Sequence, residues 1–171
     1  ERFRFHDYPV DQLWGVQNET PNFLINVHVI ADRRGAEDYL SRLSEVGRKY
    51  DQVIDGLKHR QQLGVVPPRF VIEHVLRSMR EFAGLAPAAN PLHVHFVERV
   101  AALPGLAEDD RRMLLERCTQ AIAAGVVPAY QRLIAVLERQ LPLATSDDGA
   151  WKLPDGDAFY AWRLRSETTT D

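Results

Sequence analysis

The sequence contains little of what builds cross-linked, membrane-spanning or strongly charged proteins. Cys118 is the only cysteine in 171 residues, which excludes an intrachain disulfide and a cluster of thiolate metal ligands. No apolar run approaches the roughly 20 residues that span a bilayer, so we expect no membrane segment. The net charge is −3, without the basic surplus that predicts binding to nucleic acid or to an anionic membrane.

Short catalytic motifs are also missing. The sequence has no G-x-S-x-G, P-loop, G-x-G-x-x-G or H-E-x-x-H motif, so it gives no direct support to a hydrolase, nucleotide or zinc site. His93 and His95 are the nearest approach to a metal site. They would share a face only on a strand, and on the helix that we predict here they diverge by about 200°. A small metal-binding protein that uses this pair is a third-ranked hypothesis.

Other polar or reactive residues have simpler interpretations. Cys118 lies among apolar residues at helical spacing, which indicates a buried hydrophobe rather than a nucleophile. The segments 147–149 and 155–157 resemble fragments of a calcium loop but lack its alternating ligands, so turns explain them better. The first seven residues lack the apolar core of a signal peptide, which favours a cytoplasmic protein unless a signal precedes them in a longer chain.

The composition is that of a globular protein, with 45% hydrophobic and 26% charged residues. Apolar residues recur at three- and four-residue steps from Gly35 onward, which predicts amphipathic helices. We expect an all-α chain, an antiparallel helical bundle or set of hairpins in a single domain or segment over residues 1–171. Its N-terminal 34 or so residues should be irregular or partly extended, with 22–30 as a short strand or extended segment. The helices are expected at 35–64, 67–84, 90–105, 108–125, 128–141 and 155–162.

The tetrapeptide Gly-Val-Val-Pro occurs twice, at 64–67 and 125–128. Glycine commonly ends a helix and proline commonly begins one, so each copy predicts a break between two helices. Two interpretations are open. The copies are either independent examples of a common junction or the marks of two related helical hairpins.

The C-terminal stretch combines a turn signal, an aromatic helix and cap-type residues. Asp155 and Gly156 predict the start of a helix that carries Tyr160 and Arg163. An arginine beside an aromatic residue can bind a carboxylate or stack on a ring, although an ordinary helix end has the same composition. The final residues 168–171 are of the type that precedes a helix, so we expect the helical structure to continue in a longer protein.

Several segments together resemble a known bacterial family. They are, in chain order, Tyr8–Gly15, Pro21–Leu24, Glu37–Leu43, Gly64–Phe70, Val127–Tyr130 and Leu153–Tyr160. In this order and at these distances they are similar to the family called domain of unknown function 885, over nearly the whole chain. Its members are longer, mainly helical proteins that resemble gluzincin-type zinc metallopeptidases, related in fold to carboxypeptidase Taq and angiotensin-converting enzyme.

The resemblance implies a role for this chain as a helical wall or lid of a bacterial zinc-metallopeptidase-like hydrolase. In such folds a helix carries H-E-x-x-H, whose two histidines bind zinc and whose glutamate activates water. Nothing in this sequence matches that helix, so the resemblance implies zinc only for a full-length member and no catalytic or metal-binding residue here. Tyr160 and Arg163 are the residues that we expect to line a substrate site.

The expected partners follow from the same resemblance. They are the remainder of the same protein or a second copy, with a peptide substrate in the full-length protein. The alternative is a stand-alone helical interaction module without enzymatic activity. A segment that packs against the rest of a peptidase should expose more apolar surface than a monomer does.

Overall fold

The computed structural model describes residues 2–168 and confirms an all-α fold, with no strand in that range. Residues 169–171, which carry most of the predicted C-terminal cap signal, lie outside the described residues. The α-helices are α1 (Val16–Asn22), α2 (Arg33–Gln62), α3 (Arg69–Gly84), α4 (Pro91–Ala101), α5 (Glu108–Ala121), α6 (Val127–Gln140) and α7 (Gly156–Thr168). Two π-helical turns, η1 (Phe23–Val27) and η3 (Ile122–Val126), extend α1 and join α5 to α6.

Helix α2 has clear sequence signals at both ends. The Asp32 carboxylate accepts a hydrogen bond of 2.7 Å from the backbone N–H of Gly35, which caps the first turn. At the other end, Gly64 has a φ of +78°, and the N–H of Val65 donates to the Arg60 carbonyl at 2.8 Å. This is the hydrogen-bond pattern of a Schellman motif, for which glycine is the favoured residue.

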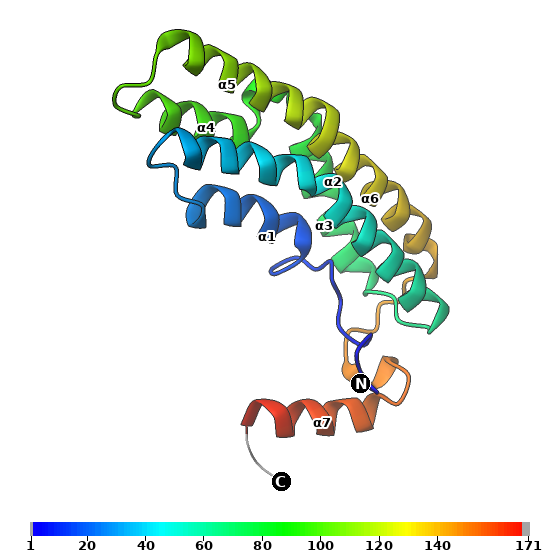
Figure 1. Ribbon diagram of the computed structural model, residues 1–171. Helices are drawn as coiled ribbons and strands as arrows, with labels where there is room; N and C mark the ends of the chain where they lie inside the picture. Colours follow the sequence, from blue (N-terminus) through cyan, green and yellow to red (C-terminus); the bar gives the residue numbers. More distant parts are fainter. Residues whose placement is uncertain (1, 169–171) are drawn as a thin grey trace.

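Helix α2 runs parallel to the long rod made by α5, η3 and α6. Ion pairs join the two, and from one pair to the next the residue number increases on both helices: Arg33–Asp110, Glu37–Arg117 and Asp51–Arg132. Helices α3 and α4 both run back between them, so α3 is antiparallel to α2 and α4 is antiparallel to α5, while the long pair is parallel (Figure 1). The bundle therefore combines the expected antiparallel packing with one parallel pair.

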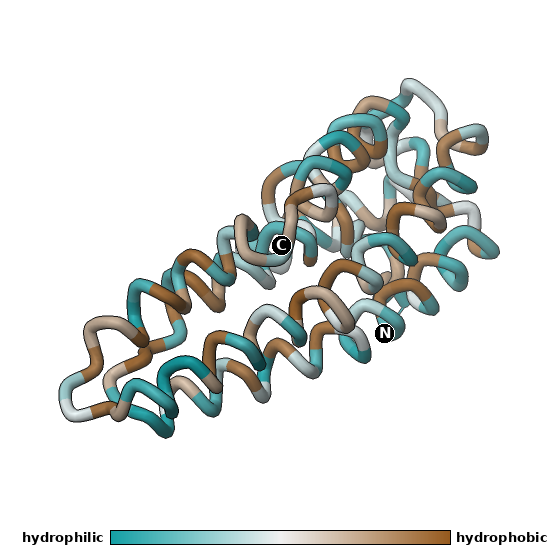
Figure 2. Tube along the Cα trace, turned by 90° about the horizontal axis from the view of Figure 1, so that it is seen from above, coloured by the Kyte–Doolittle hydropathy of each residue, from teal (hydrophilic) through white to brown (hydrophobic). Residues whose placement is uncertain are grey.

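The core lies between these helices and is contributed by all of them except α7. Figure 2 shows hydrophobic residues recurring along each helix between hydrophilic ones. The side chains that are almost completely buried include three tyrosines and a phenylalanine from three different helices: Tyr39, Tyr50, Tyr130 and Phe96. The predicted amphipathic stripe of α2 supplies much of this core.

The N-terminal region is more helical than the sequence indicated. Residues 2–15 and 28–32 are irregular, as expected, but Val16–Val27 is helical, so a strand or extended segment over 22–30 is wrong. The buried residues Val16, Thr20 and Leu24 recur every four positions. This spacing is helical, and it places one face of α1 and η1 against α2.

The predicted break at Gly125 is also wrong. The chain passes from α5 to α6 through η3 without leaving the helical region, and the N–H of Val127 donates to the carbonyl of Ile122, five residues back. Pro128 has no N–H to donate, and a π-turn just before it accommodates the missing bond. The two copies of Gly-Val-Val-Pro therefore have different structures, which argues against a pair of related hairpins.

The rod formed by α5, η3 and α6 is the one described helical stretch that is long and apolar enough, by length and composition alone, to cross a membrane. It extends over Glu108–Leu143, and 44% of its most apolar window is buried inside the protein. The core helix of a globular protein meets the same criteria, and here the rod packs against α2 and α3. We therefore assign it no membrane role.

Helix α7 stands apart from the other helices (Figure 1). It contacts the N-terminal segment 2–7, which we call the N-terminal strap. Phe3 packs its ring 5.7 Å from that of Phe159, and Arg2 forms an ion pair of 2.9 Å with Asp155. The strap is in turn held to α2 by Arg60, which donates hydrogen bonds to Asp7.

Candidate functional site

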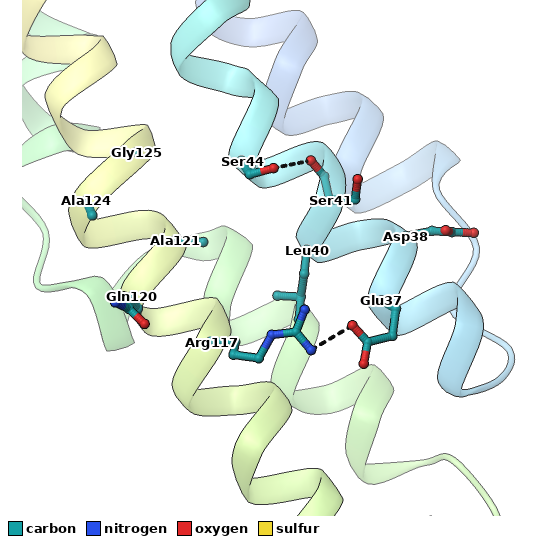
Figure 3. A pocket seen from close by; sticks show the side chains of 10 residues that line it. All are labelled: Glu37, Asp38, Leu40, Ser41, Ser44, Arg117, Gln120, Ala121, Ala124 and Gly125. Atoms are coloured by element: carbon teal, nitrogen blue, oxygen red, sulfur yellow. Dashed lines mark hydrogen bonds and ion pairs between the residues drawn. The ribbon is translucent and has the colours of Figure 1, made fainter.

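A groove lies between α2 and the junction of α5 with η3. It has a volume of about 660 Å³ and opens to solvent (Figure 3). Its lining comes from two helices: Glu37, Asp38, Leu40, Ser41 and Ser44 from α2, and Arg117, Gln120, Ala121, Ala124 and Gly125 from the rod. We call it the rod groove.

Ionic and polar contacts close one end of the rod groove. Arg117 forms an ion pair of 2.7 Å with Glu37 across it, with both side chains partly exposed (Figure 3). The Ser44 hydroxyl donates to the Ser41 carbonyl at 2.7 Å, so its proton is already used within α2. Two carboxylates and one guanidinium line the groove, which leaves it a net negative charge.

The η3 turn forms part of the wall of the rod groove. A Cβ built at Gly125 would lie 3.9 Å from the carbonyl oxygen of Leu43, an ordinary van der Waals distance, so the rod lies beside α2 at this point with room for a methyl group. The polar part of the lining combines acceptors, the carboxylates of Glu37 and Asp38, with donors, the guanidinium of Arg117 and the amide of Gln120.

The structure places Tyr160 and Arg163 on α7, outside this groove. They are three residues apart and therefore share a face of the helix. Tyr160 is 57% exposed, and Arg163 forms an ion pair of 3.0 Å with Glu167 one turn further along. Within residues 2–168 no other helix covers this face, and neither residue lines the rod groove.

The other sequence candidates do not assemble into a site. His93 contacts the Thr119 hydroxyl at 3.0 Å, whereas the ring of His95 packs 6.2 Å from that of Tyr39. Within residues 2–168 there is no group of three or more His, Cys, Asp or Glu side chains that could hold a metal ion. Cys118 is fully buried, and this burial raises the pKa of its thiol to about 12, so it is not a nucleophile.

Sequence reasoning missed the rod groove completely. Its residues are common ones on exposed helix faces, and they come from segments about 80 positions apart. Proline at position 128 was the only available signal, because a proline inside a helix alters the backbone before it. By itself that proline predicts the start of a new helix.

Comparisons with known proteins agree with the resemblance found in the sequence. The family model described as "Bacterial protein of unknown function (DUF885)" matches residues 2–171. A search of curated proteins finds no match. Among solved structures, "the putative lipoprotein from Colwellia psychrerythraea" superimposes with a TM-score of 0.92 at 20% sequence identity, over 96% of this chain.

That neighbour is much longer, and the chain spans only 28% of its length. At 20% identity the likeness shows a shared fold and nothing about activity. The family match is different in kind, because it covers all but the first residue. The chain belongs to the bacterial protein family of unknown function DUF885.

Proposed function

We propose that this chain is the helical wall or lid of a longer, zinc-metallopeptidase-like hydrolase, and that residues 1–171 form one helical unit without catalytic groups of their own. The observation that carries the proposal is the position of α7. This helix stands outside the core and exposes Tyr160, Trp162 and Leu164, each between 41% and 57%. Exposed apolar residues that cluster on one element are typical of a surface that another part of a protein covers.

The length of the structural neighbour supports the same proposal. The superposition covers 96% of this chain but only 28% of the neighbour. This is what we expect if the chain is one unit of a larger protein. In this proposal the remainder of the protein supplies the zinc site, and this unit shapes the substrate cleft. No residue of this unit is assigned to the metal.

Within the wall, Tyr160 and Arg163 are the proposed substrate contacts. They lie side by side on α7, and both are accessible. A guanidinium binds a peptide carboxylate through two parallel hydrogen bonds, and a tyrosine ring packs on an apolar side chain. The ion pair between Arg163 and Glu167 is exposed, so a substrate carboxylate can replace it at little cost.

The test uses the longer protein, with variants at these two positions. Tyr160→Ala and Arg163→Ala should raise KM for peptide hydrolysis and leave the zinc content unchanged. Arg165→Ala is the matched control, because two residues further along the helix it points to a nearly opposite side. The isolated 171-residue chain should bind no zinc and hydrolyse no peptide.

The second candidate is a stand-alone helical interaction module. It is favoured by the closed core between α2 and the α5–α6 rod, which is complete without α7. Under this alternative any sequence that follows Asp171 contains no H-E-x-x-H motif. Neither the 171-residue chain nor a longer purified protein carries zinc. Either finding would exclude the peptidase proposal.

A further inference from the structure

A second, smaller groove lies on the neighbouring face of α2, and Ser41 lines both this groove and the rod groove. It is formed where α1 and η1 face α2 and has a volume of about 270 Å³. We call it the η1 groove. Its lining residues are Thr20, Phe23 and Leu24 from the first helix and Ser41, Arg42, Glu45, Val46 and Lys49 from α2.

The floor and one wall of the η1 groove are apolar. Leu24 and Val46 line it while being 2% and 3% exposed, so they present only a small part of their surface there. Phe23 forms the wall and is 42% exposed, which is unusual for a phenylalanine beside the core. A ligand with an apolar body would therefore remove hydrophobic surface from water when it enters.

Two cations stand at the edge of this apolar surface. Arg42 lies over the Phe23 ring, 5.8 Å from its centroid, and Lys49 follows seven residues later on the same face of α2. Seven residues of α-helix correspond to about 10.5 Å, so a carboxylate can lie between them. Neither side chain forms an ion pair with another residue of the described chain.

The one carboxylate in the lining belongs to Glu45. It accepts a hydrogen bond of 2.5 Å from Arg48, which is one turn further along α2. Arg42 and Lys49 outnumber this carboxylate, so the lining keeps a net positive charge. The rod groove has the opposite character, with two carboxylates and one arginine.

We propose that the η1 groove binds a small apolar carboxylate, such as a medium-chain fatty acid. The alkyl chain lies on Phe23, Leu24 and Val46, and the carboxylate lies between Arg42 and Lys49. A volume of about 270 Å³ is just below the range of about 300–1,000 Å³ for drug-sized pockets, so the groove takes one short chain. This site is independent of any peptidase role.

The test is a titration of the 171-residue chain with octanoate, followed by NMR of backbone amides and methyl groups. Saturable shifts should centre on Leu24 and Val46. Octanamide has the same chain without the charge and should bind more weakly. The double variant Arg42→Gln/Lys49→Gln should raise the Kd for octanoate roughly tenfold, as expected for the loss of two partly exposed charge contacts, and leave octanamide binding unchanged.

Arg34→Gln is the matched control, because it removes an exposed α2 cation outside the groove and should not change the Kd. All three residues are exposed, so circular dichroism should report the same helix content in every variant. The proposal is overturned if octanoate gives no saturable shifts at millimolar concentration. It is equally overturned if the shifts centre elsewhere, or if octanoate and octanamide bind with the same Kd.

Discussion

At the scale of single residues, the environment of Tyr130 explains how α1 tolerates an internal proline. Pro21 has no N–H, so the carbonyl of Gln17, four residues earlier, loses its helical donor. The buried hydroxyl of Tyr130 donates to this carbonyl at 2.7 Å. One side chain of α6 therefore replaces a backbone hydrogen bond of α1 and fixes that helix to the core.

Tyr130→Phe should destabilise the protein by about 1–3 kcal/mol, because it leaves a buried carbonyl without a donor and removes little apolar volume. Chemical denaturation measures the change. Tyr160→Phe is the matched control, because Tyr160 is exposed and its loss of a hydroxyl should have almost no effect. A Tyr130→Phe variant as stable as the parent protein would show that the carbonyl finds another donor.

His95 makes stability depend on pH. Burial, and then the nearby Arg99, lower the pKa of this imidazole below its usual 6.5, and its buried Nε2 has no hydrogen-bond partner in the described part of the chain. The unfolded state therefore binds the proton more readily than the folded state does. The contribution of His95 to the free energy of unfolding is fully present above pH 6.5. It decreases as the pH drops through the folded-state pKa.

Urea denaturation at a series of pH values should show this slope below pH 6.5 in the parent protein and a smaller slope in His95→Leu. His59→Leu controls for the loss of a histidine elsewhere on the surface. Equal slopes in all three proteins would contradict the assignment to His95.

At the scale of elements, the two copies of Gly-Val-Val-Pro show that one tetrapeptide supports opposite structures. Gly64 has a φ of +78° and ends α2, whereas Gly125 lies inside a continuous helical rod. The two copies differ in the residue that follows them. Pro68 follows the first copy and disfavours helical backbone at Pro67, whereas Ala129 follows the second copy and allows the helix to continue into α6.

The two glycines should therefore respond in opposite directions to substitution by alanine. Gly64→Ala should cost about 1–2 kcal/mol, because a side chain disfavours the left-handed backbone. Gly125→Ala should stabilise by about 0.5–1 kcal/mol, because its backbone is helical and the nearest atom to the new Cβ is 3.9 Å away. Thermal unfolding of both variants measures this contrast, and a change of the same sign in both would refute it.

At the scale of the whole molecule, the N-terminal strap determines where α7 lies. Arg60 is only 9% exposed and donates to the Asp7 carbonyl at 2.9 Å and to its carboxylate at 2.6 Å. His6 contacts the Pro154 carbonyl at 2.8 Å, close to the start of α7. The N-terminal strap and the start of α7 are thus held together beside the end of α2.

Phe3→Ala should release α7 without unfolding the core, because the Phe3 ring contacts both Phe159 and Trp162. Amide hydrogen exchange should accelerate in residues 156–168 and stay unchanged in α2. Phe70→Ala is the control, because that side chain is half exposed and lies on α3. Unchanged exchange in α7 would mean that the strap does not hold it.

The sequence by itself determined the fold class, most helix boundaries and the family. Apolar periodicity and Gly64 act through local backbone chemistry, so their effects can be predicted from neighbouring residues. Residues 16–27 were misjudged because the helical recurrence of Val16, Thr20 and Leu24 is short and is interrupted by polar residues.

The tertiary structure alone decided the rest. The parallel packing of α2 against the rod, the continuity of the rod through Gly125 and both grooves depend on residues far apart in the sequence. Their physical cause is packing between helices, which local sequence patterns do not encode. Tyr160 and Arg163 could be placed on one helix from the sequence, but only the structure separates that helix from the core.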